Sequence, residues 1–296
     1  MEKTFHPIAM DRKELSDMHL QIRRMCHDLN APLRAIHGFA DILQRREAEQ
    51  LSEKGNMYLQ RMVAATHTME QIVSRLHQYA RLATHEIKLK PVSIAQFTEE
   101  VIATHYRNLP AGASLQWQAD QSPVWRSDPV LLETMLRELV DNALCYTREG
   151  SPAQVNIVWR VEQDRLLLAV SDEGMGIAPE YHQRVFDLFE RLHGRDQFPG
   201  AGTGLTMVLK AVSLLGGAIA LASAVDFGAT VQISLPNGHG ICVTPDNAMA
   251  LAGILPLDNN SQTPIDRFPL SSSPPAGESD RVSLREFHDK SEETNA

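Results

Sequence analysis

A chain of 296 residues with 43% hydrophobic content can form packed cores in two domains of ordinary size. The formal net charge is −9, but residues 237–296 hold nine acidic and four basic residues, so the rest is nearly balanced and does not suggest a nucleic-acid-binding surface. The three cysteines share no short spacing typical of metal sites or disulfides, and no secretion signal or bilayer-length apolar run is visible, so we expect a cytoplasmic protein without membrane insertion.

Two long amphipathic helices are predicted over residues 12–85. Apolar residues recur at spacings of three, four and seven at Leu15, Met18, Ile22, Met25, Leu29, Ile36 and Leu43. A second run follows the polar stretch 45–56, with the same spacing at Leu59, Met62, Thr66, Met69, Val73, Leu76, Ala80 and Ala83. Such a helical hairpin has more apolar surface than one pair of helices can bury, which predicts a homodimeric four-helix bundle. Packing of the hairpin against its own downstream domain is the alternative.

His27 stands at an outward position of the first predicted helix, directly before Asp28. Pro32 follows in mid-helix, where its missing N–H should bend the helix within about a turn of the histidine. Taken alone, this pattern is also typical of an ordinary surface histidine beside a kink.

A mixed α and β pattern follows a connector at residues 86–93. Asp128 and Pro129 are suited to be the N-cap and first residue of a helix. Helices are expected over 94–109, 129–146 and from 204 to about 215, and strands over 115–118, 124–126, 154–161, 165–171, 218–222 and 230–235. This order predicts an α/β sandwich in which helices cover one face of a mixed sheet. Residues 237–296 are acidic and contain a Ser/Pro run at 271–275, which predicts a disordered tail.

Three segments of this second region carry chemistry. Glu138 and Asn142 lie four residues apart on one helix face, where their oxygens could hold Mg²⁺. Asp172 ends a strand and precedes Gly174 and Gly176, so the backbone could approach a flat ligand closely. The carboxylate could then accept a hydrogen bond from an amine of that ligand. The glycine-rich run 200–205 precedes a helix and could bind phosphates through backbone N–H groups.

In this order the motifs resemble those of sensor histidine kinases. Residues 27–33 resemble the H box, 138–147 the N box, 172–177 the G1 box, 185–193 the F box and 200–205 the G2 box. The resemblance spans roughly residues 12–236. It implies a dimerisation and histidine-phosphotransfer domain at 12–85 after a short extension at 1–11, a linker at 86–93, a Bergerat-type (GHKL) ATP-binding domain at 94–236, and the tail at 237–296.

The resemblance also implies a role for each motif residue. His27 would attack the γ-phosphorus of ATP, Asp28 would orient its ring, and Glu138 would serve proton handling and, with Asn142, Mg²⁺ binding. The nucleotide would be held by Asn142, Tyr146, Asp172, Gly174, Gly176, Ile177, Gly200, Gly202, Thr203, Gly204 and Leu205. Arg191 or Arg195 would reach the γ-phosphate, and the sequence does not choose between them. The phosphoryl group would pass to an aspartate of a response-regulator receiver.

Several residues depart from the family pattern. Glu138 stands where these kinases more often have Asn, and related clamp ATPases use a Glu there to activate water, so an ATP-hydrolysing clamp remains an alternative. Cys145 replaces a frequent Lys or Arg of the N box. Ala31 lies four residues after His27, where kinases with phosphatase activity often have Thr or Asn, which argues against that activity. With only 26 residues before His27, we expect the signal to come from a separate upstream sensor, and a kinase-fold adaptor is a further alternative.

Overall fold

The computed structural model describes residues 12–119, 124–162, 164–192, 194, 198 and 200–237, with side chains from His19 onward. The expected extension at 1–11 and the expected tail from 238 lie outside these residues. The chain divides into two compact units, with the boundary between Glu86 and Ile87. Within the described part, none of the helices is long and apolar enough to cross a membrane.

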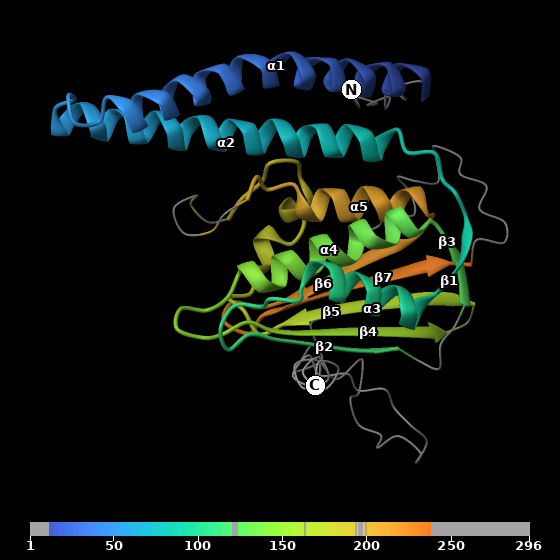
Figure 1. Ribbon diagram of the computed structural model, residues 1–296. Helices are drawn as coiled ribbons and strands as arrows, with labels where there is room; N and C mark the ends of the chain where they lie inside the picture. The colour runs from blue at the N-terminus through green and yellow to red at the C-terminus, as the bar shows by residue number, and fades with distance from the viewer. Residues whose placement is uncertain are drawn as a thin grey trace, which may run out of the picture. The chain divides into compact units, whose positions relative to one another are not determined.

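The first unit is an antiparallel helical hairpin. Helix α1 (Arg12–Arg46) and helix α2 (Glu53–Ala83) run side by side, and α1 is bowed as it continues through Pro32 (Figure 1). The turn before α2 ends in Ser52, whose hydroxyl accepts a hydrogen bond of 3.1 Å from the backbone N–H of Gly55. This N-cap satisfies one of the free donors at the start of α2.

The two helices bury only part of their apolar surface against each other. Cys26, Leu33 and Val73 form the buried cluster of the hairpin, with Ile22 and Leu76 packed against it. Most of the apolar series read from the sequence on α1 lies outside this cluster: the side chains of Met25, Leu29, Ile36 and Leu43 are 44–62% exposed. The inner face of α1 instead follows the row Cys26, Leu33 and Ala40 at intervals of seven residues. The four exposed residues of the series form a second, uncovered apolar face.

The second unit is an α/β sandwich built on a five-stranded mixed sheet. The strand order is β2-β4-β5-β7-β6, in which β2 is parallel to β4 and the other neighbours are antiparallel. The bounds are β2 Ser114–Ala119, β4 Gln154–Glu162, β5 Arg165–Asp172, β6 Ala218–Ser223 and β7 Ala229–Pro236. A separate antiparallel pair consists of β1 (Lys90–Ser93) and β3 (Val124–Ser127).

Helices α3 (Ile94–His105), α4 (Pro129–Cys145) and α5 (Gly204–Leu214) cover one face of the sheet (Figure 1), and the short 3-10 helices η1 (Pro179–Tyr181) and η2 (Arg184–Phe186) precede α5. The predicted helical hairpin followed by an α/β sandwich is therefore confirmed. Helix α3 ends at His105, four residues before the predicted end at residue 109, with Tyr106 as its C-cap. Pro110 disfavours helical conformation only in residue 109, so the predicted end was placed too close to it.

The core of the sandwich lies between α4 and the sheet. Fully buried side chains come from α4 and from the inward positions of the strands, and include Leu131, Leu132, Met135, Leu136, Ile157, Trp159, Leu166, Leu168 and Ile233. Asp128 fixes the start of α4: its Oδ1 accepts from the N–H groups of Val130 and Leu131, and its Oδ2 accepts from the N–H of Lys88 at 2.7 Å. The predicted N-cap thus also anchors the segment that leads into β1.

Substituting Leu132→Ala should destabilise the second unit, because this side chain is fully buried in α4. Removal of a buried leucine side chain costs about 2–5 kcal/mol in free energy of unfolding. Val130→Ala, in the same helix but 53% exposed, should change it by less than about 0.5 kcal/mol. Urea unfolding followed by circular dichroism measures both, and equal losses in the two variants would contradict this assignment of the core.

Candidate functional site

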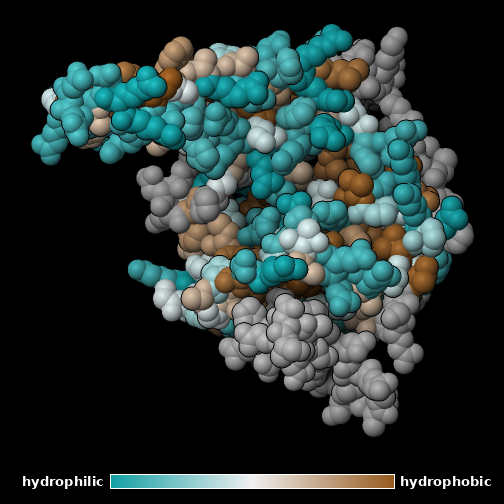
Figure 2. Space-filling model, in the orientation of Figure 1, coloured by the Kyte–Doolittle hydropathy of each residue, from teal (hydrophilic) through white to brown (hydrophobic). Residues whose placement is uncertain are grey.

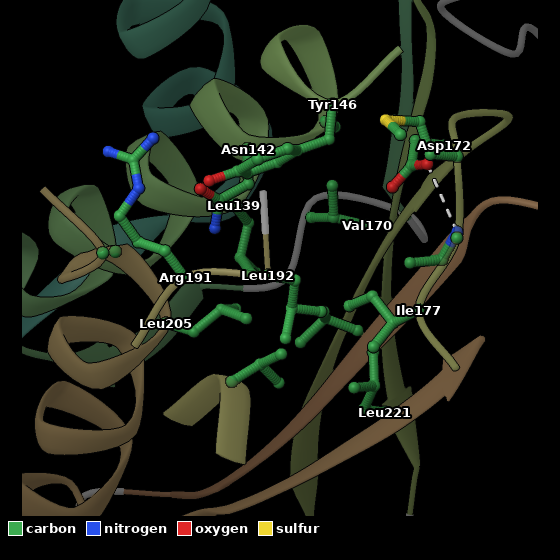
Figure 3. A pocket seen from close by; sticks show the side chains of 18 of the residues that line it. Leu139, Asn142, Tyr146, Val170, Asp172, Ile177, Arg191, Leu192, Leu205 and Leu221 are labelled. Carbon is green, nitrogen blue, oxygen red and sulfur yellow. Dashed lines mark hydrogen bonds between the residues drawn. The ribbon is translucent and has the colours of Figure 1, made fainter. Parts of the chain in front are cut away.

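A pocket lies between α4, the ends of β5, β6 and β7, and the segment before α5. Figure 3 shows the carboxylate of Asp172 and the amide of Asn142 on opposite sides of it, with apolar side chains between them. Nine of the residues predicted for nucleotide binding line this pocket: Asn142, Tyr146, Asp172, Gly176, Ile177, Arg191, Gly202, Gly204 and Leu205. Glu138, Gly174, Gly200 and Thr203 are not among its lining residues.

Asp172 provides the polar group at one end of the pocket. Its Oδ1 accepts hydrogen bonds from the N–H of Gly174 at 2.8 Å and from the N–H of Ala229 at 3.2 Å. Burial raises the pKa of the Asp172 carboxyl, and these two backbone hydrogen bonds partly oppose the rise. Since both bonds use Oδ1, the Oδ2 oxygen can accept from an amine of a ligand.

Glycines allow three backbone segments to meet at this end of the pocket. A Cβ at Gly174 would lie 2.2 Å from the Tyr146 carbonyl oxygen, and one at Gly176 (φ +69°) would lie 1.8 Å from the carbonyl oxygen of Ala224. Likewise, a Cβ added at Gly228 (φ +75°) would lie 2.0 Å from the carbonyl oxygen of Asp172. No larger residue fits at these positions without backbone movement.

The opposite end of the pocket combines oxygen ligands with a helix N-terminus. Helix α5 begins at Gly204, so the first N–H groups of the helix are available to an anion there. A Cβ at Gly204 would lie 3.1 Å from Glu138 Oε2 and 3.2 Å from the terminal atoms of Asn142, which shows that both α4 side chains converge on this point. Glu138 itself is 8% exposed.

This geometry fits a Mg²⁺ ion held jointly by protein and ligand. Carboxylate and amide oxygens suit Mg²⁺, which commonly keeps water and substrate phosphates as its other ligands. Within the described ranges, no group of three or more His, Cys, Asp or Glu side chains could hold a metal by itself. A metal at Glu138 and Asn142 would therefore depend on the phosphates of a bound nucleotide.

The segment before α5 is tied together through Arg191. Its guanidinium donates to the backbone carbonyls of Gly200, Phe198 (2.7 Å) and Gly194 (3.4 Å). The Phe198 ring packs on the Tyr146 ring with centroids 5.3 Å apart. In Figure 3 the Arg191 side chain extends away from the apolar side chains of the pocket. The alternative candidate, Arg195, lies outside the described residues.

The sequence analysis assigned no role to the apolar walls of the pocket, although five of their residues lie within the N, G1 and F boxes. The walls are formed by Leu139, Ala143, Val170, Met175, Val185, Leu192, Leu221 and Val231. Val170 and Val231 alternate with outward residues on their strands, so strand periodicity could have assigned them to the inner face. It could not have placed them at the pocket rather than elsewhere in the core.

His27 is the exposed group of the hairpin. The side chains of His27 and Asp28 are 88% and 80% exposed, and Nδ1 of the imidazole lies 3.3 Å from Oδ1 of the carboxylate. With the ring proton on Nδ1, the imidazole donates to Asp28 and carries its lone pair on Nε2. The outward position predicted for His27 is thus observed, with the partner that the sequence suggested.

Two family models match the chain in the order of its two units. Residues 17–85 match the His Kinase A (phospho-acceptor) domain, and residues 127–239 match the histidine kinase-, DNA gyrase B- and HSP90-like ATPase domain. His27 falls within the first matched region, and the residues that line the pocket fall within the second.

The curated relatives are longer than this chain. The chain is 27% identical over 214 residues to the phytochrome-like protein Cph1 of Synechocystis, a match that covers 72% of this chain and 28% of that protein. It is 29% identical over 215 residues to the sensor protein kinase PmrB of Pseudomonas aeruginosa, covering 71% and 44%. The chain thus spans less than half the length of these relatives.

Among solved structures, the crystal structure of full-length ShkA in complex with AMPPNP is similar to this one. The TM-score is 0.55 with 23% sequence identity, and the match covers 73% of this chain and 45% of that chain. At this identity, the likeness supports the fold.

Gly176→Ala should disrupt the pocket, because the new methyl group would overlap the Ala224 carbonyl in addition to straining the backbone. Gly150→Ala is the matched control: its φ of +74° is similar, but nothing lies within 4 Å of its Cβ position. The control should lose only the roughly 1–2 kcal/mol expected for a left-handed backbone conformation, whereas Gly176→Ala should lose more stability and also nucleotide affinity. Thermal unfolding and calorimetric titration with an ATP analogue measure the two effects; equal behaviour would contradict the close approach.

Asp172→Asn should separate stability from binding. Because burial holds the pKa of Asp172 above that of an unfolded carboxyl, the stability of the wild type falls as pH rises from the unfolded pKa through the folded pKa. The asparagine variant lacks this loss, so it should unfold at the same or a higher urea concentration than the wild type at pH 8, yet bind an ATP analogue at least about tenfold more weakly. Glu173→Gln, at the exposed neighbouring carboxylate, should leave both properties unchanged. Lower stability of Asp172→Asn at pH 8 would disprove the inferred cost of the buried charge.

Proposed function

Since this chain belongs to the histidine kinases of two-component systems and contains their transmitter module, we propose that it is an ATP-dependent protein kinase that phosphorylates its own His27. The observation that carries the proposal is the pairing of an exposed His27–Asp28 dyad on a helical hairpin with a pocket that has an amine acceptor at one end and a phosphate-binding helix terminus at the other. Each is unremarkable in isolation, but together they provide an acceptor and a donor site for one phosphoryl transfer.

In the proposed complex, adenine occupies the end of the pocket near Asp172. Its amine donates to the Oδ2 oxygen, while the apolar walls contact the ring. The triphosphate extends toward the N-terminus of α5, where Gly202 and Gly204 allow close approach of the backbone. Mg²⁺, held by Asn142 and Glu138 together with the phosphates, would neutralise the charge that develops on the leaving group.

At the acceptor, the Asp28 carboxylate holds the proton of His27 on Nδ1 and so directs the lone pair of Nε2 outward. The carboxylate also stabilises the positive charge that develops on the ring as Nε2 attacks phosphorus. Because His27 is exposed, its reactivity depends on this neighbour rather than on burial. The product can then donate its phosphoryl group to an aspartate of a response-regulator receiver, with an upstream sensor protein controlling the kinase in the cytoplasm.

A homodimer is the proposed assembly of the hairpin. The exposed apolar side chains lie on both helices and include Met25, Leu29, Ile36, Phe39, Ile42, Leu43, Tyr58, Met62 and Met69. Figure 2 shows apolar residues interrupting the hydrophilic surface of the hairpin. A contiguous face of this size is unusual on a monomer and fits a second hairpin that completes a four-helix bundle.

Incubation with γ-labelled ATP and Mg²⁺ should label the protein, and His27→Gln should abolish the label. The substitution leaves the pocket intact, so binding of an ATP analogue should be unchanged. Acid lability and alkali stability of the label identify a phosphohistidine. A label that persists in His27→Gln would disprove the assignment of the acceptor.

The same assay distinguishes a kinase from a clamp ATPase. Phosphate release measured in parallel should not exceed the turnover of labelled His27. Sustained hydrolysis that survives His27→Gln but is lost in Glu138→Gln would instead identify Glu138 as the residue that activates water.

Ile36→Glu should prevent dimerisation, because it places a charge in the uncovered apolar face of α1, where desolvation of an unpaired carboxylate is unfavourable. Ser74→Glu introduces the same charge at an exposed position of α2 and serves as the control. Analytical ultracentrifugation should find a monomer for the first variant and a dimer for the second. Two dimeric variants would contradict the assignment of the interface.

A further inference from the structure

Basic side chains occur on both helices of the hairpin in the neighbourhood of His77, and His27 is one of them. Arg23 precedes His27 by one helical turn on the same face of α1, and Arg81 follows His77 by one turn on α2. Each histidine directly follows an inward residue of the hairpin: His27 follows Cys26 of the buried cluster, and His77 follows Leu76, which packs against that cluster. The packing of the hairpin therefore brings the faces that carry His27 and His77 together.

The electrostatics of His77 agree with this placement. Its pKa is lowered first by burial of the ring and then by the positive charges of Arg81, Arg23 and His27. These are the charged groups that act on it from its own helix and from α1. His77 is thus a partly buried imidazole whose protonated form is disfavoured by burial and by neighbouring cations, and an incoming anion would oppose this effect.

We propose that Arg23, His77 and Arg81 form a phosphoryl-binding cluster for the group carried by His27, and that His77 takes up a proton when this group arrives. The inference rests on the proposed function, in which His27 is the acceptor. It adds two positioning groups and one proton-binding group that the family motifs do not include.

The chemistry of the transfer balances without a further reactant. The Nε2 lone pair forms the N–P bond, the bond from phosphorus to the bridging oxygen of ADP breaks, and ADP leaves with that electron pair. The ring keeps its Nδ1 proton beside Asp28. The phosphoryl group now carries nearly two negative charges next to His77, which binds a proton from solvent, and the guanidinium groups can donate to the phosphoryl oxygens. Loss of the phosphoryl group to a receiver returns that proton to solvent.

The cluster should retard loss of the phosphoryl group. His77→Ala and Arg23→Ala should each shorten the half-life of phosphohistidine at pH 7 by about fivefold to tenfold, the effect of one lost charge-assisted contact. His67→Ala is the matched control, because His67 lies on the same helix, is 62% exposed and faces Glu70 instead of this cluster.

The decisive experiment uses the full chain phosphorylated chemically on His27 with phosphoramidate, so that it does not depend on ATP. An NMR titration should find the pKa of His77 raised by about one unit or more after phosphorylation, while the ring signals of His67 at a fixed pH stay unchanged. His27→Glu, which places a permanent carboxylate at the same position, should raise the pKa of His77 in the same direction without any phosphorylation.

The outcomes separate the two proposals. Phosphorylation by phosphoramidate with the expected His77 response, but no labelling by ATP, would retain the cluster and refute the kinase. Two results would refute the cluster and retain the kinase when ATP labels the protein. One is that the pKa of His77 does not change in the phosphorylated protein or in His27→Glu. The other is that the half-life of phosphohistidine does not change in His77→Ala.

Discussion

The nucleotide pocket depends on the hydrogen bonds of the partly buried Asp172 carboxylate. One of its oxygens accepts from Gly174 in the loop that follows β5 and from Ala229 at the start of β7, so it fixes two segments that are far apart in sequence. Keeping a charge in a buried position is unfavourable, as the raised pKa of this carboxyl indicates, and the two N–H groups offset only part of that cost. A ligand amine at the free oxygen would offset more of it. The site is thus arranged to be more stable with a ligand than without one.

The hairpin is under a different constraint, because α1 has two apolar faces that are stabilised by burial and one reactive polar face that must stay in water. The inner face is formed by small or medium side chains such as Cys26 and Leu33, which allow α1 and α2 to approach closely. The uncovered apolar face is the surface that we propose a second hairpin covers. The remaining face carries His27 and Asp28 in water, where a nucleophile can meet both a nucleotide and a receiver. Apolar residues on α1 belong to two different faces of the same helix. For this reason, the spacing of apolar residues alone did not identify which face packs against α2.

Local sequence determined much of this architecture. Periodicity located both long helices, Asp128 and Pro129 marked the start of α4, and the polar turn between β4 and β5 marked their hairpin. Contacts between segments that are far apart in the chain could not be predicted from local sequence. Gly228 and Ala229 complete the surroundings of Asp172 from more than fifty residues away, and nothing in their own neighbourhood distinguishes them from an ordinary turn. Likewise, Arg191 was considered as a phosphate ligand, but its guanidinium binds carbonyl groups of its own segment, a role set by the tertiary path of the chain.

The two proposed anion sites use different kinds of donor, and this difference has a consequence for the direction of transfer. The pocket binds phosphates through backbone N–H groups at the start of α5, whose dipoles are permanent and do not respond to occupancy. The groups around His27 include an imidazole whose charge can change. Besides the permanent charges of Arg23 and Arg81, this acceptor site gains a further positive charge as the phosphoryl group arrives, so it stabilises the phosphorylated state more strongly than it attracts other anions beforehand. It also weakens as soon as a competing aspartate draws the group away, because the proton then leaves His77. A fixed cation in place of His77 would hold the phosphoryl group more firmly and would for that reason release it less readily to a receiver.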